Sequence, residues 1–266
     1  VSGDSAAISD FSMETGNSRL HVQASAVYDS FSDLAENVAD IRVRANIDQS
    51  HVGVEDILYF LPALRDSLPV NLNPSMRVFL DAGISGTVNN ILLHHFNMNA
   101  LSDTHLNASG TLVGLPDLTN INLNLSLDKF YTTRSDMLAI LPDTLLPDSI
   151  APPEWINVNG NFRGNFITAE LSTDLTTNLG SVNLAGHMDL DSSSVTRGFD
   201  AKLDVQEFNL GALLMQPQTI GKLDLQAALH SDGLTKKEMN SAVELTVNHF
   251  QYKNYTYRDL KASATV

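Results

Sequence analysis

Residues 121 to 128 read INLNLSLD, and apolar and polar residues alternate through this stretch without a break. On an extended chain, Ile121, Leu123, Leu125 and Leu127 fall on one side, and the residues between them fall on the other. Such alternation is typical of a β-strand that has one dry face and one wet face. The stretch therefore predicts a strand, and its pattern can be followed outward along the chain.

The same period of two recurs in many other segments, with short turn signals between them. Clear examples are residues 41–48, 182–190, 202–206, 222–229 and 242–247. Helix candidates are few and short, and they begin near residues 30, 56, 136 and 209. The pattern predicts a mainly β protein with mostly antiparallel strands, which we expect to form one elongated, curved sheet.

An apolar phrase that contains two Leu-Pro pairs occurs twice, as DILYFLPALRDSLP at residues 56–69 and as DMLAILPDTLLP at residues 136–147. The two copies are offset by 80 residues (136 − 56), and Asp56 aligns with Asp136. An Asp in the first turn of a helix can accept free backbone N–H groups of that turn, and a following Pro interrupts the helix. We interpret each phrase as a short helix that closes one β unit and covers an end or edge of the sheet.

Further matches extend the internal similarity beyond this phrase, for example Gly86 with Gly164 at an offset of 78 residues (164 − 86). The predicted unit is about 80 residues long and holds one short helix and about four strands. The predicted boundaries are residues 1–53 for the tail of an upstream repeat, 54–130 for repeat one, 131–208 for repeat two and 209–266 for a partial repeat three. We expect all of them to form one continuous β domain, and we expect the chain to be a fragment of a longer one.

The composition limits the class of partner. The chain has 266 residues, with 16 Lys and Arg against 31 Asp and Glu, so its formal net charge is −15. Nucleic acid and anionic membrane surfaces would be repelled, so we expect no nucleic-acid partner, and any lipid contact has to be apolar. The absence of Cys excludes disulfides, Cys-ligated zinc and thiol catalysis.

No pattern in the sequence indicates an enzyme, a cofactor or a metal site. The chain lacks a P-loop, a G-x-G-x-x-G turn, an H-E-x-x-H helix and a G-x-S-x-G elbow. His94 and His95 are adjacent, so on a regular strand they would point to opposite faces and could not easily share a metal ion. We expect the other histidines to be surface or hydrogen-bonded strand residues, and we expect a protein that is not an enzyme.

The apolar strand faces allow two interpretations. They can fill the packed core of a sandwich or barrel, or they can line a groove that holds acyl chains. Repetition favours the groove, because a stack of similar strands builds a long sheet with a uniform inner face. The lipid-groove candidates are Ile121, Leu123, Leu125, Leu127, Val182, Leu184, Met188, Leu190, Leu203, Val205, Leu223, Leu225, Leu245 and Val247.

The repeated Leu-Pro phrases, together with WINVNGNFRGNF at 155–166 and VNLAGHMDLD at 182–191, resemble the AsmA-like superfamily and, within it, the TamB (translocation and assembly module) branch found in Bacteroidetes. The resemblance implies a periplasmic protein that is anchored in the inner membrane through a segment outside this chain. It also implies an open, apolar-lined β trough that takes part in outer-membrane biogenesis. The implied partners are phospholipid or another acyl-chain lipid and an outer-membrane β-barrel protein.

Two hypotheses of different class follow. In the first, the segment holds or conducts phospholipid acyl chains between the two membranes. In the second, it is a scaffold or chaperone-like module whose exposed sheet edge pairs with a strand of an outer-membrane or secreted protein in transit. A surface adhesin or carbohydrate-binding β-solenoid is a more distant third, disfavoured by the single Trp and the few other aromatic residues.

Overall fold

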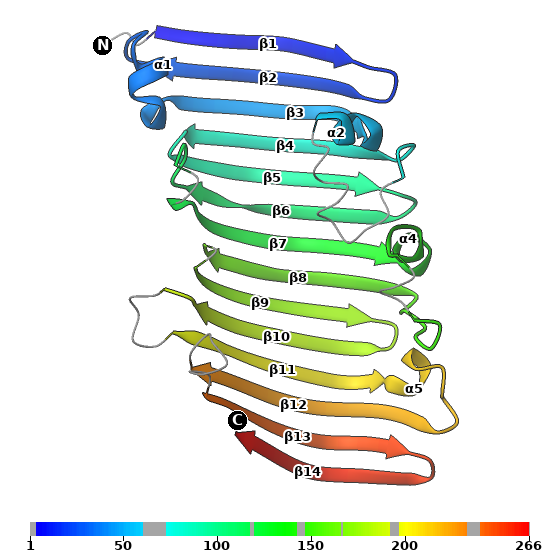
Figure 1. Ribbon diagram of the computed structural model, residues 1–266. Coiled ribbons are helices and arrows are strands. Elements are labelled where there is room, and N and C mark those ends of the chain that lie inside the picture. The colour runs from blue at the N-terminus through cyan, green and yellow to red at the C-terminus, as the bar shows by residue number, and fades with distance from the viewer. Residues whose placement is uncertain are drawn as a thin grey trace. The chain divides into compact units, whose positions relative to one another are not determined.

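The computed structural model describes residues 4–60, 73–117, 120–142, 147–165, 167–191, 197–232 and 240–265. The chain divides into two units, Val1–Pro142 and Asp143–Val266, called unit 1 and unit 2 below. Both units are built mainly of antiparallel strands, so the predicted fold class is confirmed. In each unit the strands follow one another in a single layer in chain order (Figure 1).

Unit 1 contains seven strands in its described residues, and each pairs antiparallel with the next. Short connections join most of them, as expected for a meander. The strands are β1 (Asp4–Glu14), β2 (Arg19–Tyr28), β3 (Arg42–Gly53), β4 (Arg77–Thr87), β5 (Asn90–Ala100), β6 (Thr104–Val113) and β7 (Asn122–Thr133).

Unit 2 repeats this arrangement with seven described strands, again paired antiparallel in chain order. They are β8 (Trp155–Gly164), β9 (Thr168–Thr177), β10 (Gly180–Asp189), β11 (Gly198–Asn209), β12 (Ile220–Asp232), β13 (Asn240–Tyr252) and β14 (Tyr255–Thr265). Each segment quoted for its alternation overlaps one of the strands in the two units, which period-two patterning explains.

The pairing register shifts within several strands. In unit 1, shifts fall between Ile8 and Phe11 of β1, between Ile47 and Ser50 of β3, and between Leu93 and Phe96 of β5. Such bulges bend a strand and leave backbone groups without ladder partners. Ser50 is 2 % exposed, and its Oγ accepts from the His21 N–H at 2.9 Å and donates to the Asp48 carbonyl at 2.8 Å. A buried hydroxyl thus satisfies backbone groups at one of these bulges.

The helices are short: α1 (Asp33–Glu36), the 3-10 turn η1 (Val38–Asp40), α2 (Val54–Phe60), α4 (Arg134–Ile140) and α5 (Leu210–Leu213). In unit 1, α2 and α4 lie at the end of the sheet where β3 and β7 finish (Figure 1). Val54 and Leu58 of α2 and Met137 of α4 are buried. These helices therefore cover one end of the strands, as the sequence predicts.

The two aligned aspartates lie in the first turn of α2 and α4, but their carboxylates bind elsewhere. Asp136 accepts from the Asp103 N–H at 2.8 Å and from Thr104 Oγ1 at 2.8 Å, in and beside the turn between β5 and β6. Asp56 accepts from Thr15 and Ser18, which belong to the turn between β1 and β2. The prediction that these carboxylates cap their own helices was wrong, because each one joins its helix to a neighbouring hairpin instead.

Proline interrupts the second phrase as predicted. Helix α4 ends at Ile140, and Leu141 is extended because the ring of Pro142 disfavours a helical residue before it. Residues 61–72, which include Pro62, and residues 143–146 lie outside the described residues.

Helices α2, α4 and α5 follow β3, β7 and β11, so four strands separate each from the next. Gly86 and Gly164, which the internal similarity aligns, are the second-last residue of β4 and the last residue of β8, with φ of 128° and 129°. The repeat boundaries at residues 53, 130 and 208 stay a prediction.

Candidate functional site

The apolar face of unit 1 can be read from the register, because residues directly opposite each other on paired strands share a face. Starting from Leu125 of β7, every step across the sheet meets another apolar residue or a Gly. One such row is Ile8, Ala24, Ala45, Ile84, Leu93, Gly110 and Leu125; the next is Phe11, Val22, Ile47, Ala82, Phe96, Ala108 and Leu127. These rows, with those parallel to them, are called the apolar face of unit 1.

Unit 2 has an apolar face of the same kind. One row is Val158, Leu175, Val182, Val205, Leu225, Val247 and Leu260; the next is Gly160, Thr173, Leu184, Leu203, Ala227, Leu245 and Ala262. Residues from distant parts of the chain thus become direct neighbours. Most of the lipid-groove candidates in this unit occupy these two rows.

The structure brings the candidates together within each unit. Leu123, Leu125 and Leu127 lie on the apolar face of unit 1, and Met188 and Leu223 join the candidates on the apolar face of unit 2. Ile121 and Leu190 lie just outside β7 and β10, so their predicted place on a strand was wrong by one residue. Strand ends are set by local backbone bonding, for example Leu190 N–H to the Ile167 carbonyl at 2.7 Å.

Sequence reasoning missed much of the face. The apolar-face residues of β1 to β6 in unit 1 were not candidates, and neither were Val158 of β8 and Leu175 of β9 in unit 2. The alternation at residues 41–48 was a signal for β3, and β9 carries a weaker one because Thr173 stands among its apolar positions.

The apolar faces are only partly covered. Among the described strand residues, Val205 at 8 % and Ala169 at 9 % are the buried apolar positions of unit 2's face. The other apolar positions quoted for the two rows are half-buried in the middle of each sheet, and exposure rises towards the edges, to 53 % for Ile8 and 46 % for Leu260. Each face therefore offers an apolar surface to a ligand.

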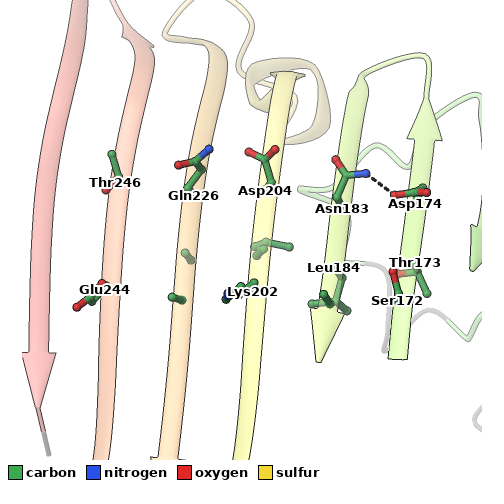
Figure 2. Close-up of a pocket in the computed structure, with 14 residues that line it drawn as sticks. Ser172, Thr173, Asp174, Asn183, Leu184, Lys202, Asp204, Gln226, Glu244 and Thr246 are labelled. Atoms are coloured by element: carbon green, nitrogen blue, oxygen red, sulfur yellow. Dashed lines mark hydrogen bonds between the residues drawn. The ribbon is translucent and has the colours of Figure 1, made fainter. Parts of the chain in front are cut away.

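The opposite faces are polar, and unit 2 carries a hollow of about 430 Å³ there. Figure 2 shows Asn183, Asp204, Gln226 and Thr246 in a row across four strands, with the Asn183 amide donating to Asp174 at 2.5 Å. The hollow exists because small residues, Ala185 and Ala228, flank Lys202 in the adjacent row. This arrangement can hydrogen-bond a polar solute.

Histidines on the polar faces pair with carboxylates. His21 of β2 lies between Asp10 of β1, with Nε2 to Oδ1 at 3.0 Å, and Asp48 of β3. His230 Nδ1 lies 2.6 Å from Asp200 and its Nε2 3.3 Å from Asp232. Asp10, Asp48 and Asp200 lie on strands next to that of their histidine, so register fixes these partners, whereas Asp232 lies two residues from His230 on β12.

The prediction that His94 and His95 point to opposite faces was wrong. A bulge in β5 turns both imidazoles to the polar face, where His94 Nε2 is 2.7 Å from Ser85 Oγ and His95 Nε2 is 2.8 Å from Asp81. In the described residues, no group of three or more His, Asp or Glu side chains is arranged to hold a metal ion.

Carboxylates set the pKa of two of these histidines. Hydrogen bonds to Asp48 and then to Asp10 raise the pKa of His21 above 6.5, and Asp200 and then Asp232 do the same for His230. A raised pKa in the folded state contributes stability that is present below the unfolded pKa and is lost as pH rises through the folded one. Protonated His21 and His230 therefore stabilise the sheet on the acid side.

We expect His21→Asn and His230→Asn to flatten the pH dependence of stability. In the parent chain, these pairs should raise the urea midpoint at about pH 5.5, and this increase should be lost by about pH 8.5. His187→Asn is the control, because His187 has no recorded side-chain partner among the described residues. An equal flattening in all three variants would contradict the assignment.

Comparisons with known proteins add no relative: no protein-family model, curated protein or solved structure matches the chain. None of the helices in the described ranges has the length and apolar content needed to cross a membrane.

Proposed function

We propose that this chain is a non-catalytic segment that holds the acyl chains of phospholipid or another lipid against its apolar faces. The observation that carries the proposal is the continuity of each face: seven strands contribute apolar residues in register, and most of these are half-exposed. Monomeric proteins rarely expose contiguous apolar patches above a few hundred Å², and larger ones mark sites of interaction.

The dimensions and energetics suit an acyl chain. Six inter-strand spacings of about 4.8 Å make each face about 29 Å wide, against about 15 Å for one leaflet of bilayer hydrocarbon. Each methylene removed from water contributes about 0.8 kcal/mol. The rows carry no charged side chains, so an acyl chain can lie across several strands. A contact of this kind is not specific for one molecular shape, which suits a lipid better than a specific small molecule.

The resemblance of the repeated phrases to AsmA-like proteins supports a cellular setting for this role. In the proposal, the chain is a periplasmic part of an inner-membrane-anchored protein that acts in outer-membrane biogenesis, with an outer-membrane β-barrel protein as partner. The net charge of −15 favours contact with acyl chains over contact with anionic headgroups.

Native mass spectrometry of the protein purified from bacteria tests the proposal. We expect co-purified phospholipid in the parent chain and less of it when Leu123 and Leu125 are both changed to Asp, because two carboxylates would then lie in the apolar face of unit 1 and could not be desolvated there. Asn122→Asp with Asn124→Asp is the matched control, since it adds the same charges to the polar face of the same strand.

Circular dichroism of both double variants shows whether the sheet remains folded. If the aspartate pair on the apolar face unfolds the chain, Leu123→Ala with Leu125→Ala is used instead, with a smaller expected loss of lipid. Parent protein free of lipid, or equal lipid in the apolar-face and polar-face variants, would overturn the proposal.

Strand pairing is the second candidate, and one observation favours it. β14 pairs with β13 on one side, carries no described strand on the other, and is exposed along its whole length. An unpaired edge can add a strand from another chain. A parent protein that carries a bound peptide and no lipid in the same mass spectra would support this candidate over the first.

A further inference from the structure

Two arginines on the polar face of unit 1 stand side by side, and neither forms an ion pair with another described residue. Arg42 and Arg44 are two residues apart on β3, so both point to the same face about 6.6 Å apart along the strand. Among the described residues, neither guanidinium makes a recorded hydrogen bond or ion pair. In a chain with nearly twice as many acidic as basic residues, two neighbouring arginines outside any described ion pair are an unusual arrangement.

Hydroxyl groups flank these guanidiniums on both neighbouring strands. Arg44 lies between Ser25 of β2 and Ser85 of β4, and Arg42 lies opposite Thr87 of β4. All five residues line a hollow of about 680 Å³. The register thus places two planar guanidinium donors and three hydroxyl donors around one open space.

Acidic side chains lie near one end of this hollow. A smaller hollow at the start of β3 is lined by Arg42 together with Asp29, Asp33 and Asp40. The Asp33 carboxylate is already engaged, because it accepts from the Ser30 N–H at 2.7 Å and from the Asn37 amide at 2.8 Å. Arg44 is one step further into the sheet and does not line that hollow, which makes it the better anchor for an anion.

We infer that Arg42 and Arg44, with Ser25, Ser85 and Thr87, form a binding site for a phosphate or phosphate-monoester group. Guanidinium groups bind phosphate in a bidentate, charge-assisted manner, and hydroxyls complete the contacts. Phosphate matches this donor set better than a carboxylate does, since it offers more oxygens and a second negative charge. The neighbouring Ser85 is held by His94, which fixes one hydroxyl in the site.

The site is independent of the proposed acyl-chain contact. Its side chains lie on the polar face, and Val43 between the two arginines points to the apolar face on the other side of the same strand. A lipid that lies on the apolar face of unit 1 cannot place its phosphate on Arg44 through the sheet. Failure of either proposal therefore leaves the other intact.

The test is an amide NMR titration of the full chain with inorganic phosphate and with glycerol 3-phosphate, at constant ionic strength. We expect saturable shifts at residues 25, 42–44 and 85–87, and we expect Arg44→Gln to weaken binding about tenfold. Arg77→Gln is the matched control. Arg77 is an exposed arginine of β4 on the same polar face of the sheet as Arg44, but it does not line the hollow. Unchanged spectra elsewhere in Arg44→Gln show that the variant is folded.

Tighter binding of glycerol 3-phosphate supports a phosphate monoester as the ligand, and tighter binding of inorganic phosphate supports the free ion. Shifts that do not saturate, or an equal loss of affinity in Arg44→Gln and Arg77→Gln, would show general charge attraction and would overturn the site.

Discussion

Replacing Asp136 by alanine is expected to lower the free energy of unfolding by about 3 kcal/mol. Asp136 is 2 % exposed, and its carboxylate accepts from the Ser102 N–H at 3.3 Å, the Asp103 N–H at 2.8 Å and Thr104 Oγ1 at 2.8 Å. Thr104 is itself 6 % exposed and lies 2.9 Å from the Thr132 hydroxyl. Removal of the carboxylate takes the acceptor from two part-buried backbone N–H groups and one of two partners from the buried Thr104 hydroxyl, and the loss of these three bonds dominates the cost.

The measurement for Asp136→Ala is the urea midpoint by circular dichroism, together with hydrogen exchange of the Asp103 amide. That amide should lose protection, because it donates to the carboxylate that has been removed. Asp40→Ala is the control, since Asp40 is exposed and its side chain has no recorded bond among the described residues. A loss of stability no larger than in Asp40→Ala would show that α4 is not held to the β5–β6 turn through Asp136.

Replacing Gly211 by alanine is expected to lower the free energy of unfolding by about 3 kcal/mol, because the new Cβ would displace the backbone. A Cβ at this position would lie 1.7 Å from the Ile220 carbonyl oxygen, closer than any two such atoms can approach. Gly211 lies in α5, and Ile220 begins β12, so the helix packs against the entry of the next strand. The clash is with main chain and cannot be relieved by a change of rotamer.

Trp155, the single tryptophan, reports on unit 2 because it begins β8 in that unit. We expect its fluorescence transition in urea to move to lower denaturant in Gly211→Ala. Gly186→Ala is the matched control: a Cβ there meets no atom closer than the Asp200 carbonyl oxygen at 3.4 Å, so the change should be within about 1 kcal/mol. Equal midpoints in the two variants would contradict the close approach of α5 to β12.

Much of the fold could be predicted from residues 121–128 and from the segments that share their pattern. Period-two alternation shows which residues share a face along one strand, because that property depends only on extended backbone geometry. The positions of α2 and α4 could also be predicted, since a short apolar segment that begins with Asp and is interrupted by Pro is typical of a short helix. The exact ends of β7 and β10 could not, and Ile121 and Leu190 were placed one residue too far inside.

Bulges account for the main errors at single residues. The sequence contains no signal that β5 bulges between Leu93 and Phe96, so His94 and His95 were assigned to opposite faces. A bulge is chosen by the competition between two whole strands for hydrogen bonds and side-chain packing. For the same reason, the carboxylate partners of His21, which come from β1 and β3, could not be predicted from the sequence.

The sequence by itself determined that this protein is built of antiparallel strands with one apolar and one polar side, since local alternation and turn residues are enough for that. The tertiary structure decided which strand positions become neighbours: Val205 between Val182 and Leu225, Arg44 between Ser25 and Ser85, and Asp136 against the β5–β6 turn. Cross-strand register depends on bulges and on contacts between segments far apart in the chain. A single strand's sequence does not contain these interactions, so the composition of both faces emerges only when the sheet is assembled.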